Sequence, residues 1–330
     1  MHWRWFVLLL WLPTRTWADE PLPALEQVTI YSPLDQAPQP VRYWLPPDEN
    51  AVPLLVSLHS WSADVTQDHA DWQREAVARK WAFLQPNFRG INDHPEACGS
   101  PLARQDVLDA VDWMIQQRAI DPRRIYLAGV SGGGHMTMLM VAYHPERFSA
   151  ASAWVGISDL AEWHAFHNHE GTLGKYAQLM NQCCGGAPRQ SATIDLEYYR
   201  RSPIHFLQYA AAMPIDLNAG VTDGKTGSVP IHQTLRAFNV LAAANHSPLV
   251  TELEMEELWA DGRLKRPRAE DEAEDLSMDR NLYLRRQAGP SRVTIFDGGH
   301  EGLAHPACEW LSRQERATTP APSIEAVPPR

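Results

Sequence analysis

The sequence predicts an α/β fold in which a mostly parallel sheet of the eight-stranded type carries helices on both faces. Short apolar runs that end in polar or glycine-containing loops, as buried strands do, occur at 54–58, 125–130, 213–220 and 292–296. An apolar stripe at Val107, Leu108, Val111 and Met114 predicts a helix over residues 102–118 with one face on the sheet. Two early antiparallel strands are expected at 28–31 and 41–45.

A single domain is expected over residues 19–316, because about 300 residues suit one α/β core. Two stretches, 159–212 and 251–287, are predicted to be cap-like insertions into this domain. The second is dense in charge between Arg263 and Asp275, and such a run is typical of a solvated helix or loop.

The first 18 residues have the features of an export signal. Arg4 provides a positive start, residues 5–12 form an apolar run, and Thr16-Trp17-Ala18 predicts cleavage after Ala18. The run is too short to span a bilayer, so the mature chain is expected to be secreted or periplasmic. At the other end, the proline-containing residues 317–330 are expected to form a disordered tail.

The charge balance is acidic. The 29 basic and 40 acidic residues give a net charge of −11, and removal of a signal with two arginines and no acidic residue leaves −13. Nucleic acid is therefore not expected as a partner, and anionic membranes are disfavoured too. No other segment approaches transmembrane length, so we expect no stable membrane insertion.

A glycine-flanked serine follows one of the predicted strands. Gly129-Val130-Ser131-Gly132-Gly133 has the G-x-S-x-G spacing, and the residues after it are expected to form a helix to about Tyr143. Glycines at these positions let a strand and a helix approach each other closely around a sharp turn. The pattern predicts that Ser131 projects above the sheet as a nucleophile.

A serine hydroxyl needs a base, and the base needs an acid, so both must follow in the chain. Asp223 lies in the turn after the strand at 213–220, and His300 follows the strand at 292–296 and two glycines. Of the competing acids, Asp216 falls inside a strand and Asp297 is too close to His300 in sequence. We therefore predict a catalytic triad of Ser131, Asp223 and His300.

The oxyanion that forms during acyl transfer needs two backbone N–H donors. Gly132 is expected to supply one, and Trp61, in the loop after the strand at 54–58, is expected to supply the other. The Trp61 indole then either lines the rim of the acyl pocket or packs its own loop.

The cysteines are predicted to form disulfides after export. Cys183 and Cys184 are adjacent and pair with each other only in strained geometry, so Cys98 is expected to pair with one of them, with Cys308 as the fourth cysteine.

No cofactor and no metal are predicted. The chain has no C-x-x-C motif. His164, His167 and His169 are spaced nearly as metal ligands are, but their aromatic and polar neighbours suit an ordinary half-exposed helix.

The order of these motifs resembles that of the α/β-hydrolase superfamily, and more narrowly the catalytic domain of the prolyl oligopeptidase (S9) family and its secreted esterase-like relatives. The likeness spans about residues 40 to 312. It includes the Asn87-Phe88-Arg89-Gly90 loop, Gly227-Ser228-Val229-Pro230 after Asp223, and a His59-Ser60-Trp61 segment in which Ser60 stands where glycine is usual. The resemblance implies the α/β-hydrolase fold and an acyl-enzyme hydrolase.

Prolyl oligopeptidases carry a β-propeller ahead of the catalytic domain, whereas about forty residues precede the hydrolase core here, too few for even one blade beyond a short strand pair. The expectation is thus an open site and a serine esterase acting on small-molecule or polysaccharide esters, carbohydrate-linked or aromatic. An S9-like peptidase acting on short peptides is the alternative, and an inactive binding protein on the same fold is a further one.

Overall fold

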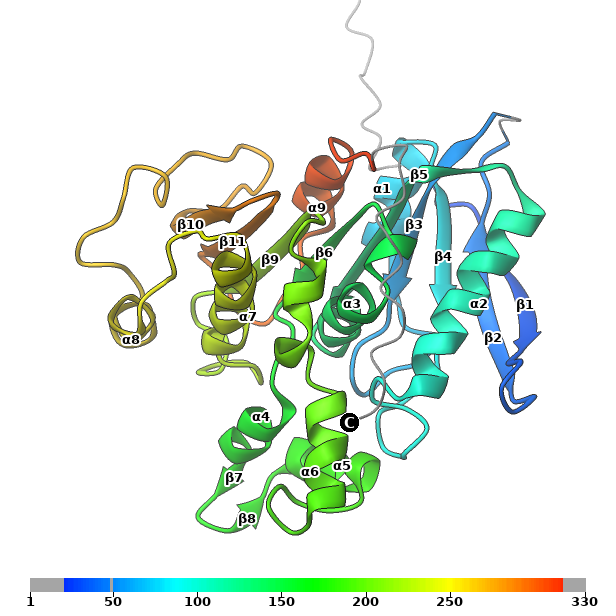
Figure 1. The fold of residues 1–330 in the computed structure, drawn as a ribbon. Coiled ribbons are helices and arrows are strands. Elements are labelled where there is room, and N and C mark those ends of the chain that lie inside the picture. The colour runs from blue at the N-terminus through cyan, green and yellow to red at the C-terminus, as the bar shows by residue number, and fades with distance from the viewer. Residues whose placement is uncertain (1–20, 48–49, 317–330) are drawn as a thin grey trace, which may run out of the picture.

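A computed structural model describes residues 21–47 and 50–316 of the chain (Figure 1). The predicted export signal, residues 1–18, and the predicted C-terminal tail, residues 317–330, lie outside the residues that the structure describes. Within the described ranges, no helix is long and apolar enough to cross a membrane.

In the described part of the chain, the central sheet has nine strands in the order β1-β2-β4-β3-β5-β6-β9-β11-β10. Their bounds are β1 Glu26–Tyr31, β2 Pro38–Trp44, β3 Val52–Leu58, β4 Ala82–Pro86, β5 Ile120–Val130, β6 Ala150–Trp154, β9 Ile215–Gly220, β10 Leu282–Ala288 and β11 Ser291–Phe296. Strands β4, β3, β5, β6, β9 and β11 run parallel, while β1, β2 and β10 pair antiparallel with their neighbours. The mostly parallel sheet and the two early antiparallel strands are confirmed.

The sheet has one strand more than the predicted eight-stranded type. The extra strand, β10, comes from the end of the 251–287 segment, which we expected to be a cap-like insertion. Leu282, Leu284, Arg286 and Ala288 are buried on one face of β10, and the residues between them are more exposed. An arginine at one of the inward positions interrupts the apolar alternation that identifies a strand.

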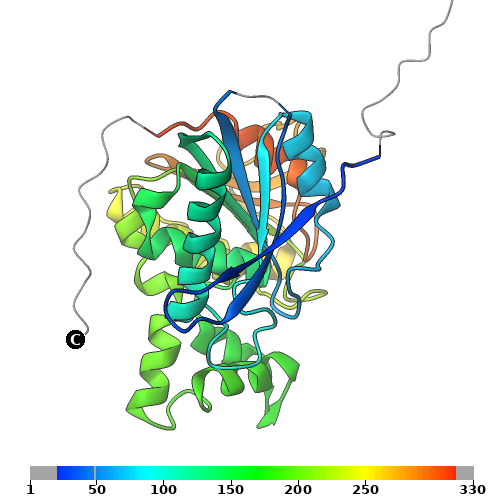
Figure 2. The same cartoon turned by 90° about the vertical axis from the view of Figure 1, so that its right-hand side faces the viewer.

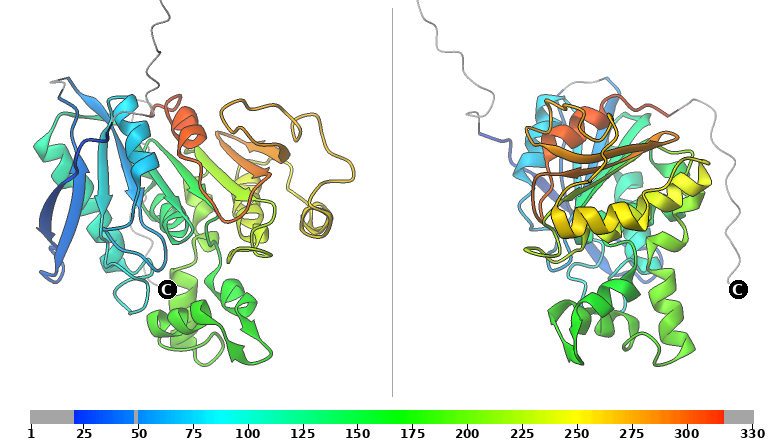
Figure 3. Two further views of the ribbon diagram at one scale, coloured as in Figure 1. Left: turned by 180° about the vertical axis from the view of Figure 1, so that it is seen from behind. Right: turned by 90° about the vertical axis from the view of Figure 1, so that its left-hand side faces the viewer.

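Helices cover both faces of the sheet. Figure 1 shows α2, α3 and α7 on one face, and the view from behind in Figure 3 shows α1 and α9 on the other. Their bounds are α1 Ala70–Ala78, α2 Pro101–Gln117, α3 Gly132–Tyr143, α7 Ile231–Ala244 and α9 Ala304–Leu311. Helix α3 is buried from Gly132 to Ala142, as expected for a helix that is apolar all round. The predicted helices at 102–118 and after Ser131 are confirmed.

The first insertion forms a small helical subdomain below the sheet, at the carboxyl ends of the parallel strands (Figure 2). It contains α4 Leu160–Phe166, the hairpin of β7 Asn168–His169 and β8 Thr172–Leu173, α5 Lys175–Cys184, α6 Ala192–Arg200, and the short 3-10 helices η3 Pro203–His205 and η4 Leu207–Ala210. Its separate core includes Leu160, Trp163, Met180 and Tyr198, and receives Trp61 from the loop after β3. We call residues 159–212 the cap.

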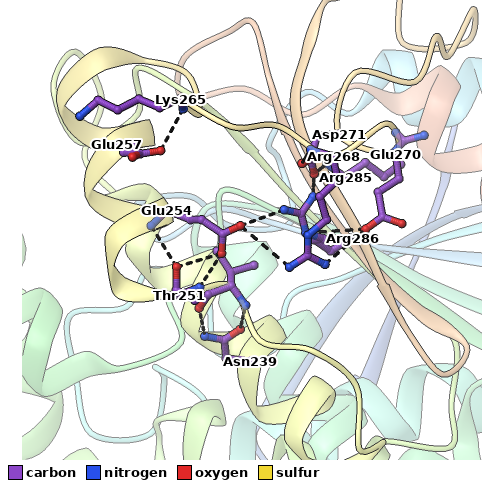
Figure 4. Close-up of polar contacts among 11 residues, drawn as sticks. Asn239, Thr251, Glu254, Glu257, Lys265, Arg268, Glu270, Asp271, Arg285 and Arg286 are labelled. Carbon is purple, nitrogen blue, oxygen red and sulfur yellow. Dashed lines mark hydrogen bonds and ion pairs between the residues drawn. The ribbon is translucent and has the colours of Figure 1, made fainter.

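The second insertion lies along the β10–β11 edge of the sheet and begins with α8 Glu252–Asp261 (Figures 1 and 4). A capping box joins Thr251 and Glu254 at its start. Glu254 also pairs with Arg286 of β10 at 3.0 Å, and Arg286 pairs with Asp271. Asp271 and Arg286 are buried, at 0% and 2% exposure. The expectation that this charged run is solvated is therefore wrong for Asp271, which forms a buried ion pair with Arg286, an inward-facing residue of β10.

We expect Asp271→Ala to lower the free energy of unfolding by about 3–5 kcal/mol, because it leaves the buried Arg286 guanidinium without that partner. The matched control is Asp261→Ala, whose exposed pair with Lys265 spans 3.6 Å and contributes about 0–1 kcal/mol. Urea unfolding of both variants measures the difference. Similar, small losses in the two variants would contradict the structural role of the buried pair.

Candidate active site

Ser131 occupies the sharp turn between β5 and α3. Its backbone has φ 59° and ψ −118°, a conformation that L residues adopt rarely and at a cost. The Ser131 N–H donates to the Trp154 carbonyl of β6 at 2.9 Å, which fixes the turn to the sheet. A Cβ on Gly129 would lie 2.4 Å from the Gly133 carbonyl carbon. The structure thus has the predicted strand–turn–helix geometry, and the close approach of Gly129 and Gly133 leaves no room for a side chain at position 129.

Asp223 and His300 are hydrogen-bonded to each other. Asp223 follows β9 and is fully buried, and His300 follows β11 with a quarter of its side chain exposed. Asp223 Oδ2 lies 2.9 Å from His300 Nδ1, and Asp223 Oδ1 accepts from the N–H groups of Gly224 at 2.8 Å and Val229 at 3.2 Å. A carboxylate held in this way places the imidazole proton on Nδ1 and leaves Nε2 for proton transfer. The competing acid Asp216 lies inside β9, where it contacts Ser152 and Arg292.

The loop of His300 reaches the turn that carries Ser131. A Cβ on Gly302 would lie 2.3 Å from Cγ2 of Val130, the residue before Ser131, and 3.4 Å from Cβ of Trp154. Ser131 and the Asp223–His300 pair therefore lie at the same edge of the sheet. Within the described ranges, the Ser131 hydroxyl makes no hydrogen bond, so its bond to His300 stays a prediction.

Ser228 is the hydroxyl that His300 contacts instead. Its Oγ lies 3.4 Å from His300 Nε2, at the long end of hydrogen-bonding distance. The sequence places Ser228 in the segment before α7 and predicts no role for it. Its position five residues after the predicted acid was the available signal, but a serine in a glycine-containing turn has many local explanations.

The predicted oxyanion donors come from two backbones in close contact. A Cβ on Gly132 would lie 2.2 Å from the Trp61 nitrogen, so only glycine permits this approach. The Gly132 N–H is at the first position of α3, where no carbonyl of the helix can accept it. Ser60 fixes the other loop, because its hydroxyl donates to the Val130 carbonyl at 3.1 Å. The serine that replaces the usual glycine thus ties this loop to the turn of Ser131.

The Trp61 indole packs in the interior and does not line a pocket rim. It is 1% exposed. Its ring packs in an edge-to-face arrangement against Trp163 of the cap, with 4.9 Å between the ring centroids. It also contacts His135 of α3 at 5.8 Å. Of the two roles expected for this side chain, the pocket wall is wrong, and the indole packs against the cap and α3 as well as within its loop.

The cap histidines have separate hydrogen-bond partners. His164 Nε2 lies 2.9 Å from Asn181 Oδ1, whereas His167 Nε2 donates to the Ser228 carbonyl at 2.8 Å. Burial lowers the pKa of both imidazoles, which favours their neutral forms. No group of three metal-binding side chains occurs among the residues that the structure describes.

The four cysteines are buried thiols in the structure. The Cys98 thiol forms a hydrogen bond with Cys183, at the junction of the catalytic core and the cap. Burial opposes ionisation of Cys98, but the contacts with Cys183 and Arg201 together hold the pKa of Cys98 below its ordinary value. The disulfide between Cys98 and α5 stays a prediction, and Cys183 is the thiol that contacts Cys98.

Several known proteins resemble parts of this chain. Residues 103–257 match the model of the prolyl oligopeptidase family. Feruloyl esterase B of Neurospora crassa is 28% identical over 150 residues, which cover 41% of this chain and 49% of the esterase. The acylamino-acid-releasing enzyme of Rattus norvegicus is 30% identical over 221 residues, covering 61% of this chain and 28% of the enzyme. The chain spans less than half of the length of these curated relatives.

Solved structures show the same fold. A puromycin-hydrolyzing peptidase of Mycobacterium tuberculosis superposes with a TM-score of 0.56 at 20% identity, over 73% of this chain and 36% of the peptidase. An acylaminoacyl peptidase of Pyrococcus horikoshii gives a TM-score of 0.53 at 18% identity, over 68% and 36% of the two chains. The chain therefore has the α/β-hydrolase fold, and its residues 103–257 are similar to the prolyl oligopeptidase (S9) family.

Proposed function

We propose that this chain hydrolyses carboxylic esters through an acyl-enzyme on Ser131. The observation that carries the proposal is the Asp223–His300 hydrogen bond of 2.9 Å at the sheet edge where the strained Ser131 turn lies. Asp223 orients the imidazole, and the Gly132 and Trp61 backbones face the same turn as donors for an oxyanion.

The reaction follows from these roles. His300 Nε2 removes the Ser131 proton while Ser131 Oγ attacks the ester carbonyl, and the Gly132 and Trp61 N–H groups stabilise the oxyanion. The intermediate collapses when the proton on His300 passes to the departing alcohol oxygen and the carbon–oxygen bond breaks. Water then attacks the acyl-enzyme by the same steps, which releases the acid and restores Ser131.

Ester substrates, either carbohydrate-linked or aromatic, are favoured over peptides. Feruloyl esterase B is matched over 49% of its length, and acetylxylan esterase A of Emericella nidulans is 39% identical over 51 residues, which cover 17% of that esterase. The peptidase reading has its own support, because dipeptidyl aminopeptidase BIII of Pseudoxanthomonas mexicana is 28% identical, although over only 17% of that enzyme. Peptide hydrolysis is therefore the second candidate.

A substrate panel separates the two candidates. Purified protein and Ser131→Ala are assayed on p-nitrophenyl acetate, methyl ferulate, acetylated xylan and a proline-containing aminoacyl-p-nitroanilide. We expect Ser131-dependent turnover of esters and none of the anilide. Ser131-dependent cleavage of the anilide with no ester turnover would instead support the peptidase, and binding without any turnover would support an inactive protein.

We also propose that the chain is exported and cleaved after Ala18. The positive start, short apolar run and small-residue site support this proposal. Amino-terminal sequencing of the chain recovered outside the cytoplasm should begin at Asp19, whereas a chain retained inside with Met1 intact would contradict export.

A further inference from the structure

The turn that follows Asp223 places a second hydroxyl next to the proposed general base. Ser228 Oγ lies 3.4 Å from His300 Nε2, the nitrogen that must both take the Ser131 proton and deliver it to the leaving group. His300 Nδ1 is already held by Asp223 at 2.9 Å. Any group that His300 protonates must come within about 3 Å of Nε2, and therefore close to this hydroxyl.

The backbone around Ser228 is fixed against the Asp223–His300 pair. A Cβ on Gly227 would lie 2.2 Å from Asp223 Oδ1 and 2.6 Å from His300 Cβ, so the turn fits only with glycine there. The Val229 N–H donates to Asp223 Oδ1 at 3.2 Å. Ser228 thus lies between Gly227, which packs against the Asp223–His300 pair, and Val229, which is hydrogen-bonded to Asp223.

The cap fixes the same residue from the opposite side. The Ser228 carbonyl accepts two hydrogen bonds of 2.8 Å each, from Trp163 Nε1 and from His167 Nε2 at the end of α4. Trp163 also packs against Trp61, whose backbone is a proposed oxyanion donor. Helix α4 therefore holds both the loop of Trp61 and the Ser228 turn. Because the Ser228 backbone is fixed in this way, only the rotation of its side chain is lost when the hydroxyl binds a ligand.

We propose that Ser228 is a positioning residue for the leaving group, which it holds in line with His300 Nε2 by a hydrogen bond to the departing oxygen. In acylation the Ser131 Oγ–carbon bond forms, the carbon–oxygen bond to the alcohol breaks, and the His300 proton moves to that oxygen. Ser228 neither gains nor loses a proton overall. This inference rests on the proposed esterase function.

Esters that share one acyl group but differ in the leaving alcohol test the inference. p-Nitrophenolate departs without a proton, whereas the benzyl alkoxide of benzyl acetate needs one. We expect Ser228→Ala to lower kcat/KM about 10- to 100-fold for benzyl acetate and about threefold or less for p-nitrophenyl acetate. Ser228→Thr, which keeps a hydroxyl, should restore most of the lost activity on benzyl acetate.

Thr226→Ala is the matched control, because the Thr226 hydroxyl bonds Thr222 in the same turn and, among the described residues, forms no hydrogen bond with His300. Thermal unfolding of each variant identifies any general loss of structure. Equal losses on the two esters, or no loss on benzyl acetate, would overturn the role of Ser228 and leave the proposed function standing. A wild-type protein with no Ser131-dependent ester turnover would overturn both.

Discussion

Ser131→Ala is expected to lower kcat for ester hydrolysis by about 10⁵- to 10⁶-fold, because no other group can form the acyl-enzyme. Ser131 is 8% exposed and sits in a strained turn, fixed by its N–H bond to Trp154, so alanine fits the same backbone without disturbing the sheet. Its loss should therefore act on chemistry and leave thermal unfolding unchanged.

Ser312→Ala is the control for that result. Ser312 is an exposed serine at the end of α9, and its hydroxyl donates to the Glu309 carbonyl at 2.7 Å. Steady-state assays on p-nitrophenyl acetate should show wild-type activity for this variant. Residual activity in Ser131→Ala above about one part in a thousand would point to another nucleophile.

Asp223→Asn is expected to lower kcat by about 10⁴-fold, because it traps His300 in the wrong tautomer. Asp223 Oδ1 accepts from the Gly224 and Val229 N–H groups, so an asparagine keeps its carbonyl oxygen there and turns its NH₂ toward His300. An NH₂ donor facing Nδ1 forces the imidazole proton onto Nε2, which can then no longer accept the Ser131 proton.

Asp297→Asn tests the competing acid near His300. Asp297 is exposed and hydrogen-bonds Tyr283. Replacing its carboxylate by the amide of asparagine should therefore change kcat little. Measured side by side on one ester, the two variants distinguish the acids. A large loss in Asp297→Asn with activity kept in Asp223→Asn would reverse the assignment.

The parts of this site that the sequence predicts are those set by local backbone geometry. Gly129, Ser131 and Gly133 must occur together for a strand to turn into a helix at this distance, so the motif specifies its own conformation. Asp223 and His300 can be predicted because each lies in the loop after a strand of one parallel sheet, and the carboxyl ends of such strands meet at one edge.

The features that were missed depend on contacts between distant segments. The indole of Trp61 is buried because Trp163, about a hundred residues later, packs against it. The buried position of Asp271 depends on Arg286, an arginine that strand β10 carries into the interior. The contact of Ser228 with His300 spans 72 positions and has no local pattern. Periodicity and turn chemistry describe neighbours in sequence, and none of these pairs are neighbours.

Covalent labelling with a fluorophosphonate, followed by tryptic peptide mapping, tests the central claim that Ser131 is the nucleophile. Cleavage after Arg124 and Arg147 gives a peptide in which Ser131 is the only serine, and cleavage after Lys225 and Arg236 gives one in which Ser228 is the only serine. We predict one label per chain, on peptide 125–147, and none on Ser131→Ala. A label on peptide 226–236, or on any other serine, would contradict the assignment of Ser131 as the nucleophile.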